Sequence, residues 1–365
     1  MSELPEMPYL RNIGLIVTYK CQVACPHCIL EAGPNRKEQI QLNEAFNWIE
    51  QIANYRNGYI KVLSLTGGEP FYNLKKLATI SSFGEQHGLL VSAVTNAFWA
   101  STPKKAVNTL KDIPSIKMMA ISADAYHQKE IPFTRVKNAI HAAKKLDIPF
   151  QIGVCTENQQ DKEYQKIVHN LKKIVEPDQI KTAITFPVGR ALNMHNTNYV
   201  TSRDPPISAC SAGSSPIIFP NGNVIGCIGP VIDIKFDHPL LLGNLRKLSL
   251  KMILDNSEIN PIYHAIRIWG PKKLISLAHD AGLTKYLPKE YIKDSICHAC
   301  HSIMSNNKIR EFLHSLADKP EFKRKVAYAR LYYLREARMF ELMRDELNNQ
   351  SPELICECKS SRIGN

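Results

Sequence analysis

The chain has 365 residues, of which 44% are hydrophobic and 22% charged, a composition typical of an ordinary globular protein. It has no apolar run long enough to cross a bilayer and no secretion-signal pattern at its N-terminus, so we expect a cytoplasmic protein that does not bind membranes. The ten cysteines then indicate metal ligands or catalytic thiols before disulfides. The net charge of +12 comes without a nucleic-acid-binding motif, and a solvated basic face, or attraction to an acidic peptide or phosphorylated substrate, explains it as well.

Apolar runs alternate with helical patterns over residues 12–190. The runs predict six strands, at 13–19, 61–66, 89–96, 117–124, 149–156 and 180–188. Apolar residues at intervals of three and four predict helices between them, at 42–55, 74–87, 103–111, 134–146 and 162–175. Repeated strand–helix units predict an α/β fold around a buried parallel sheet, with its ligand sites at the carboxyl ends of the strands.

The first predicted strand leads into a loop with three closely spaced cysteines, Cys21, Cys25 and Cys28. Three thiolates can hold three corners of a cubane iron–sulfur cluster and leave the fourth iron free, and an open coordination site can do chemistry. The spacing alone also fits a zinc knuckle that lacks one ligand, or three unrelated thiols.

The second predicted strand ends in Gly67-Gly68-Glu69-Pro70. Two glycines let a backbone lie close against a ligand, and the glutamate can accept a hydrogen bond from an ammonium group. Taken alone, these four residues indicate a turn. Their position one strand after the cysteine loop favours a binding site.

The CxxxCxxC loop and the Gly-Gly-Glu-Pro segment together resemble the radical S-adenosylmethionine enzymes. The resemblance covers roughly residues 12–190 and implies a partial (β/α)6 barrel similar to a TIM barrel. It also implies that Cys21, Cys25 and Cys28 hold a [4Fe–4S] cluster whose free iron binds S-adenosylmethionine. Electrons from a donor such as flavodoxin or ferredoxin would cleave this cofactor to a 5′-deoxyadenosyl radical, which abstracts hydrogen from a substrate.

The same resemblance implies which residues contact the cofactor. Gly67, Gly68, Glu69 and Pro70 match the segment that binds the methionine amino group. His27 stands where the family has an aromatic residue near the adenine, although a loop histidine is more often only solvated.

Polar residues at later strand ends extend this set. Asn96 matches a Thr-Asn-Gly stretch in which Ala97 replaces the glycine, and it binds ligand or caps the following helix. Ser122 and Asp124 lie on one face of the fourth strand and match a Ser-x-Asp stretch that reaches the ribose or carboxylate of the cofactor. Arg190, in a Gly-Arg-Ala stretch after the sixth strand, is placed to meet a carboxylate with both arms.

Cys155, near the end of the fifth strand, has two interpretations. A buried free cysteine is commonly a small hydrophobic residue, and residue type alone favours that interpretation. Alternatively, its thiol faces the substrate and donates a hydrogen atom to a carbon radical, as cysteines do in radical epimerases.

Four more cysteines follow a polar linker near residues 197–206: Cys210, Cys227, Cys297 and Cys300. An Asn-Gly pair at 221–222 predicts a hairpin between the first two. This order, with its Leu-Gly-Asn segment at 242–244, resembles the twitch domain, the short form of the SPASM extension, and implies one auxiliary [4Fe–4S] cluster. Apart from the barrel, a four-cysteine zinc site fits equally well. Cys356 and Cys358 in the tail stay unassigned.

These patterns predict a barrel at 1–195, an auxiliary-cluster domain at 207–305 and a C-terminal helical segment and tail at 306–365, with a helix over 323–348. We expect an enzyme that modifies a ribosomally synthesised peptide by crosslinking, epimerisation or thioether formation. The alternative is a radical dehydrogenase or epimerase of a sugar or other small molecule. A zinc-dependent nucleic-acid-binding protein is a distant third, because it leaves residues 67–70 unexplained. The short segment before Cys21 predicts that a peptide is recognised by the barrel mouth, the auxiliary domain or a separate leader-peptide-binding protein.

Overall fold

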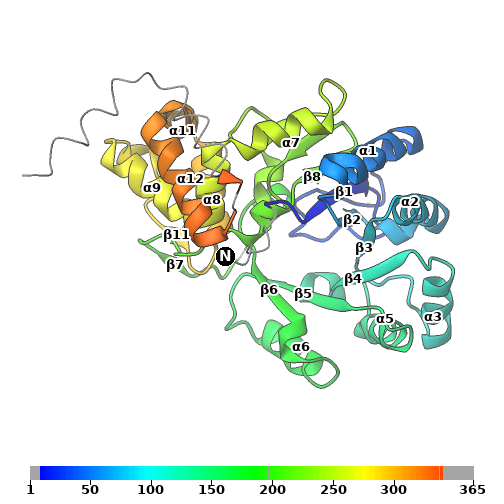
Figure 1. Ribbon diagram of the computed structural model, residues 1–365. Helices are drawn as coiled ribbons and strands as arrows, with labels where there is room; N and C mark the ends of the chain where they lie inside the picture. The colour runs from blue at the N-terminus through cyan, green and yellow to red at the C-terminus, as the bar shows by residue number, and fades with distance from the viewer. Residues whose placement is uncertain (1–8, 196, 337, 340–365) are drawn as a thin grey trace, which may run out of the picture.

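The computed structural model describes residues 9–195, 197–336 and 338–339 (Figure 1). Its centre is a nine-stranded sheet in the order β10-β9-β8-β1-β2-β3-β4-β5-β6. These strands are β1 (Asn12–Thr18), β2 (Val62–Gly67), β3 (Leu90–Thr95), β4 (Ile116–Ser122), β5 (Phe150–Thr156), β6 (Ile180–Ile184), β8 (Ile217–Ile218), β9 (Asn223–Ile225) and β10 (Leu241–Asn244). A second, two-stranded sheet pairs β7 (Thr201–Ser202) with β11 (Tyr291–Ile292).

Strands β1 to β6 are parallel and adjacent in chain order, and helices cover the outside of this curved sheet (Figure 1). The helices are α1 (Leu42–Asn54), α2 (Leu74–Gln86), α3 (Pro103–Lys111), α4 (Ala125–Gln128), α5 (Phe133–Lys145) and α6 (Lys162–Leu171). Strand side chains such as Leu15, Leu65 and Ile121 are fully buried in the main hydrophobic core, as expected for a parallel sheet covered by helices. The predicted α/β fold with six parallel strands is confirmed.

Two predicted elements are shorter than expected. The sixth strand ends at Ile184 instead of 188, because Pro187 cannot donate to a ladder and Gly189 has a φ of 55° that turns the chain into a 3-10 helix (Gly189–Asn193). That turn carries the backbone of Arg190 to the cysteine loop, where its N–H donates to Cys28 O. Helix α6 ends at Leu171, before the predicted limit of 175.

The segment after residue 206 adds strands to the barrel sheet. β8 pairs in parallel with β1 through Gly14 and Leu15, and β9 returns antiparallel to β8 around the turn that ends at Gly222. β10, which contains the Leu-Gly-Asn segment, pairs antiparallel with β9. The predicted hairpin at 221–222 is present, and the sheet therefore runs without interruption from the barrel into the region of the second cysteine set.

Six helices follow the strands: α7 (Leu250–Glu258), α8 (Pro261–Trp269), α9 (Pro271–Asp280), α10 (Ile296–Ser305), α11 (Asn307–Asp318) and α12 (Pro320–Leu334). The helix predicted over 323–348 is wrong in extent, since α12 ends at Leu334 and Arg335 has a left-handed φ of 54°. The rest of that predicted helix beyond residue 339, with Cys356 and Cys358, lies outside the described residues. None of the helices described is long and apolar enough to span a membrane.

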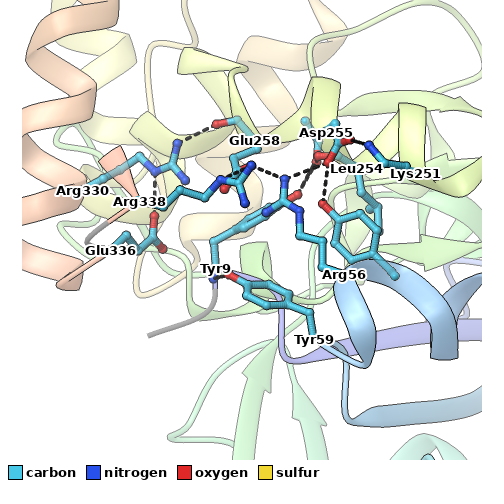
Figure 2. A network of polar contacts seen from close by, with 12 residues as sticks. Tyr9, Arg56, Tyr59, Lys251, Leu254, Asp255, Glu258, Arg330, Glu336 and Arg338 are labelled. Carbon is cyan, nitrogen blue, oxygen red and sulfur yellow. Dashed lines mark hydrogen bonds and ion pairs between the residues drawn. The ribbon is translucent and has the colours of Figure 1, made fainter. Parts of the chain in front are cut away.

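Buried ion pairs join the C-terminal helices to the barrel. Arg56, after α1, reaches Asp255 at 2.7 Å and Glu258 at 2.5 Å on α7 (Figure 2). Glu336 accepts from Arg330 of α12 at 2.6 Å and from Arg267 of α8 at 2.7 Å. Because an unpaired buried charge is costly, these contacts hold α7 against the end of α1 and α8 against α12.

Candidate active site

A cavity of about 430 Å³ lies at the carboxyl ends of the barrel strands. Most of the predicted site residues line it: Cys21, Cys25, His27, Cys28, Gly67, Gly68, Asn96, Ser122, Asp124 and Cys155, together with Cys297 of the second set. Glu69, Pro70 and Arg190 do not line it, nor do Cys210, Cys227 and Cys300. The structure thus brings one cysteine of the second set, Cys297, to the chamber that the first set lines.

The cysteine loop is held against the ends of β1 and β2 by backbone contacts. Cys21 N donates to Gly33 O, and Cys28 N donates to Cys25 O, both at 3.2 Å. Burial raises the pKa of the Cys21 thiol to about 12, so a bound cation is needed to keep it as a thiolate. Three free thiols on one loop at a cavity wall fit the three protein ligands of an open [4Fe–4S] cluster.

Gly67 and Gly68 make the close approach of β2 to the loop sterically possible. A Cβ on Gly67, which has a φ of 137°, would overlap Thr18 O, and a Cβ on Gly68 would overlap Lys20 O. Gly68 N and Glu69 N instead donate to these two carbonyls at 2.7 Å and 2.9 Å. Both glycines also border the cavity, so the pair serves loop packing as well as ligand access.

Glu69 lies behind the cavity wall and is fully buried. Its carboxylate accepts hydrogen bonds from Phe71 N at 3.0 Å, the Thr95 hydroxyl at 2.9 Å and Asn96 N at 2.8 Å. Burial, opposed by these hydrogen bonds, raises its pKa to about 7. We expected this carboxylate to meet an ammonium group of the cofactor, but in the structure it fixes the end of β3.

Asn96 faces the cavity beside the first cysteine. Its Nδ2 lies 3.6 Å from Cys21 Sγ, and its Oδ1 accepts from Gln22 Nε2 at 2.8 Å. The helix-capping interpretation is wrong, because α3 begins seven residues later and is capped by Thr102. Sequence reasoning missed Gln22, which stands next to Cys21. Its role follows only from its hydrogen bond to Asn96, a residue distant in the sequence.

His27, Asp124 and His127 form a buried cluster whose ligand atoms all lie within 4.8 Å of one another. Asp124 accepts from His127 Nδ1 at 2.9 Å, and His27 stacks on Tyr126 with ring centroids 4.4 Å apart. Burial lowers the pKa of His27 to about 4, whereas the Asp124 carboxylate outweighs burial and raises the pKa of His127 well above its usual range. Tyr126 and His127 were not predicted, although they follow Asp124 directly in the first turn of α4.

Arg190 does not present its guanidinium to the cavity. Its two terminal nitrogens donate to Cys25 O at 2.7 Å and Ala32 O at 2.6 Å. The expected bidentate contact with a carboxylate is therefore replaced by a bidentate contact with the cysteine loop itself. A forked, permanently charged donor suits this task, since it spans two carbonyls that a single ammonium cannot.

Cys155 lies on β5 and contributes to the cavity wall. Burial raises the pKa of its thiol, which keeps the S–H bond intact at neutral pH. Its position at the chamber satisfies a geometric requirement of the hydrogen-donor interpretation.

The second cysteine set comes from three separate places in the fold. Cys210 precedes a turn whose backbone is tied to α8, Cys227 follows β9, and Cys297 and Cys300 lie one turn apart on α10. A Cβ on Gly229 would lie 3.7 Å from Cys227 Sγ and 3.8 Å from Cys297 Sγ, so the thiols converge around this glycine. Burial raises the pKa of Cys227 to about 12 and that of Cys297 to about 11.

The spacing of these four thiols differs from that of a tetrahedral zinc site. Zinc–sulfur bonds of about 2.3 Å put the sulfurs of a tetrahedral site about 3.8 Å apart. Among the described residues, no three of these cysteines have their sulfurs within 4.8 Å of one another.

Comparison with known proteins gave one family and several distant likenesses. Residues 15–171 match the model of the Radical SAM superfamily. Over 317 residues, 85% of this chain and 97% of the relative, the chain is 21% identical to the "Putative peptide biosynthesis protein YydG" of Bacillus subtilis (strain 168). Among solved structures, anSMEcpe with bound AdoMet and Cp18Cys peptide is 14% identical with a TM-score of 0.45, over 68% of this chain and 82% of that one. Methylornithine synthase (PylB) is 15% identical with a TM-score of 0.40, over 52% and 58%.

Proposed function

We propose that this chain is a radical SAM enzyme whose substrate is a ribosomally synthesised peptide, modified by crosslinking, epimerisation or thioether formation; the match of residues 15–171 to the Radical SAM superfamily supports the enzyme class. The observation that carries this proposal is the single chamber that contains the first cysteine set, Cys155 and Cys297. A distant relative named for peptide biosynthesis, matched over almost its whole length, supports a peptide over the alternative of a sugar or other small molecule.

Cys21, Cys25 and Cys28 would hold the [4Fe–4S] cluster. The chemistry supplied by this cluster with S-adenosylmethionine is reductive cleavage that yields a radical able to abstract hydrogen. Gly68, Asn96, Ser122 and Asp124 border the chamber and would orient the cofactor, and His27 on its Tyr126 stack would face the adenine. Arg190 and Glu69 act one step away, on the loop carbonyls and on the end of β3.

Cys210, Cys227, Cys297 and Cys300 would hold an auxiliary [4Fe–4S] cluster in a twitch-like domain at residues 207–305, beside the barrel at 1–195 and the C-terminal segment at 306–365. Four thiolates complete such a cluster without an open iron. Cys297 borders the chamber, so a cluster held by this set would lie beside a substrate. For an epimerisation, the Cys155 S–H would break as its hydrogen atom passes to a substrate carbon radical.

The test is anaerobic reconstitution with iron and sulfide, followed by measurement of 5′-deoxyadenosine formed with dithionite. We expect cleavage in the wild type and none above background in Cys25→Ala, and about half the iron retained in Cys300→Ala. Cys155→Ala is the matched control: it should keep iron and cofactor cleavage but lose any epimerisation of a peptide substrate. Zinc without iron, or undiminished cleavage in Cys25→Ala, would contradict the proposal.

A further inference from the structure

The outer side of the cysteine loop carries a basic surface that the active site does not use. Two hollows adjoin there and share Gln39, Asn73 and Lys76, so they form one continuous surface. We call it the lysine face and define it by Lys20, Lys37, Tyr72, Lys75 and Lys76.

The lysine face is uniformly basic. No carboxylate lines either hollow among the described residues. The nearby Glu38 is held by Arg36 at 2.8 Å and adds no net charge. The lysines give this surface a net positive charge, with Lys76 Nζ donating to Gln39 Oε1 and Ile40 O. The surface therefore attracts a negatively charged protein over about 10 Å at 0.1 M salt.

The centre of the lysine face is partly apolar. Tyr72 is 44% exposed, with Lys20 Nζ 5.2 Å from its ring centroid. Leu42, which lines the second hollow, and Leu74, two residues after Tyr72, are 39% and 40% exposed. An exposed aromatic and aliphatic centre with a charged rim is the composition of a protein interface, and a small one suits a transient redox encounter.

The lysine face lies directly outside the first cysteine of the loop. Lys20 lines the outer hollow and Cys21 lines the catalytic chamber, so consecutive residues face opposite sides of one wall. The wall is fixed by the hydrogen bonds from Gly68 N to Thr18 O and from Glu69 N to Lys20 O. Since electron tunnelling falls steeply with distance, a donor seated here has a short route to a cluster on Cys21.

We propose that the lysine face docks an acidic one-electron donor protein, of the flavin or small iron–sulfur type. This inference rests on the proposed cluster at Cys21, Cys25 and Cys28. In the docked complex one electron leaves the reduced donor, which is oxidised, and enters the cluster, which is reduced; no covalent bond forms or breaks in that step. Charge complementarity supplies the encounter, and Tyr72 supplies the contact at its centre.

The test uses Lys37→Glu/Lys75→Glu in the full, reconstituted enzyme, because both lysines are exposed and outside the active site. The measured quantity is 5′-deoxyadenosine formation, driven either by reduced bacterial flavodoxin or by dithionite. We expect the flavodoxin concentration for half-maximal rate to rise about tenfold or more, with the dithionite-driven rate unchanged. The matched control, Lys111→Glu/Lys145→Glu, carries the same charge change on α3 and α5 at the opposite end of the barrel and should behave like the wild type.

An unchanged half-maximal concentration in the lysine-face variant, or an equal rise in the control, would overturn the docking site. If the double variant loses the dithionite-driven rate, the test is repeated on the wild type at two salt concentrations. Raising salt from about 0.05 M to about 0.5 M should then lower the flavodoxin-driven rate but not the dithionite-driven rate. A salt-independent flavodoxin response would then refute the inference. Failure of the wild type with dithionite would refute the proposed function itself, which keeps the two outcomes distinct.

Discussion

The two cysteine sets differ in how the chain builds them. Cys21, Cys25 and Cys28 lie on one short loop, fixed by backbone bonds to β2 and by the fork of Arg190. The second set depends on a turn after residue 209, a strand end and α10, and Cys210 N is tied to Ile266 O of α8. The first set is thus defined by local chain geometry, whereas the second requires the whole C-terminal half to be packed.

The largest expected effect on the difference between the two cysteine sets comes from neutralising Glu336, which is buried between Arg267 and Arg330. Glu336→Gln should lower the free energy of unfolding by about 3–5 kcal/mol, because two buried guanidinium groups lose their counter-charge. It should reduce iron retained by the second set more than iron retained by the first. Urea unfolding and iron analysis with Cys25→Ala and Cys300→Ala backgrounds measure both.

The control is Glu311→Gln, which removes an exposed pair with Lys308 at 2.8 Å and should leave the free energy of unfolding nearly unchanged. Equal losses in the two variants would show that the buried ion pairs do not support the C-terminal half.

The converse change targets the first set through Arg190. Arg190→Ala removes the fork from Cys25 O and Ala32 O and should weaken iron retention by the first set about 10–100-fold, as loss of outer-shell support does. The measurement is resistance of the cluster to a chelator, with cofactor cleavage as the second readout. Arg190→Lys keeps the charge but not the fork, so full retention in Arg190→Lys with loss in Arg190→Ala would assign the effect to charge alone.

The smallest expected effect is a pH dependence of stability that arises from His238, in the region of the second cysteine set. Burial lowers the pKa of His238, before β10, to about 4. Its ordinary value is about 6.5, so as pH falls from 7 to 5 the unfolded chain binds a proton that the folded chain does not, and stability decreases. This residue should contribute about 2 kcal/mol of that decrease.

His238→Asn keeps an acceptor for Leu240 N, which donates to His238 Nδ1 at 3.2 Å, but removes the titration. Urea unfolding at pH 7 and pH 5 should therefore show a shallower decrease in the variant than in the wild type. The same decrease in both proteins would mean that His238 titrates alike in the folded and unfolded chains.

Sequence reasoning predicted the barrel well because its elements are long and strongly periodic, and their order places the polar strand ends together. It missed the extension of the sheet because β8 has only two residues, Ile217 and Ile218, too few for any pattern. It did not predict the hydrogen bonds that Glu69 and Arg190 make within the chain. Residue type gave both the capacity to bind a ligand, and only tertiary contacts show that backbone groups of this chain already use them.

The pairing of β1 with β8 has a consequence for synthesis of the chain. β1 is an interior strand, with β2 on one side and β8 on the other. While a ribosome has made the barrel strands but not yet residues 217–218, the nascent protein exposes an unpaired strand edge next to its cysteine loop. The half that carries the first cysteines is therefore completed only when a much later segment emerges.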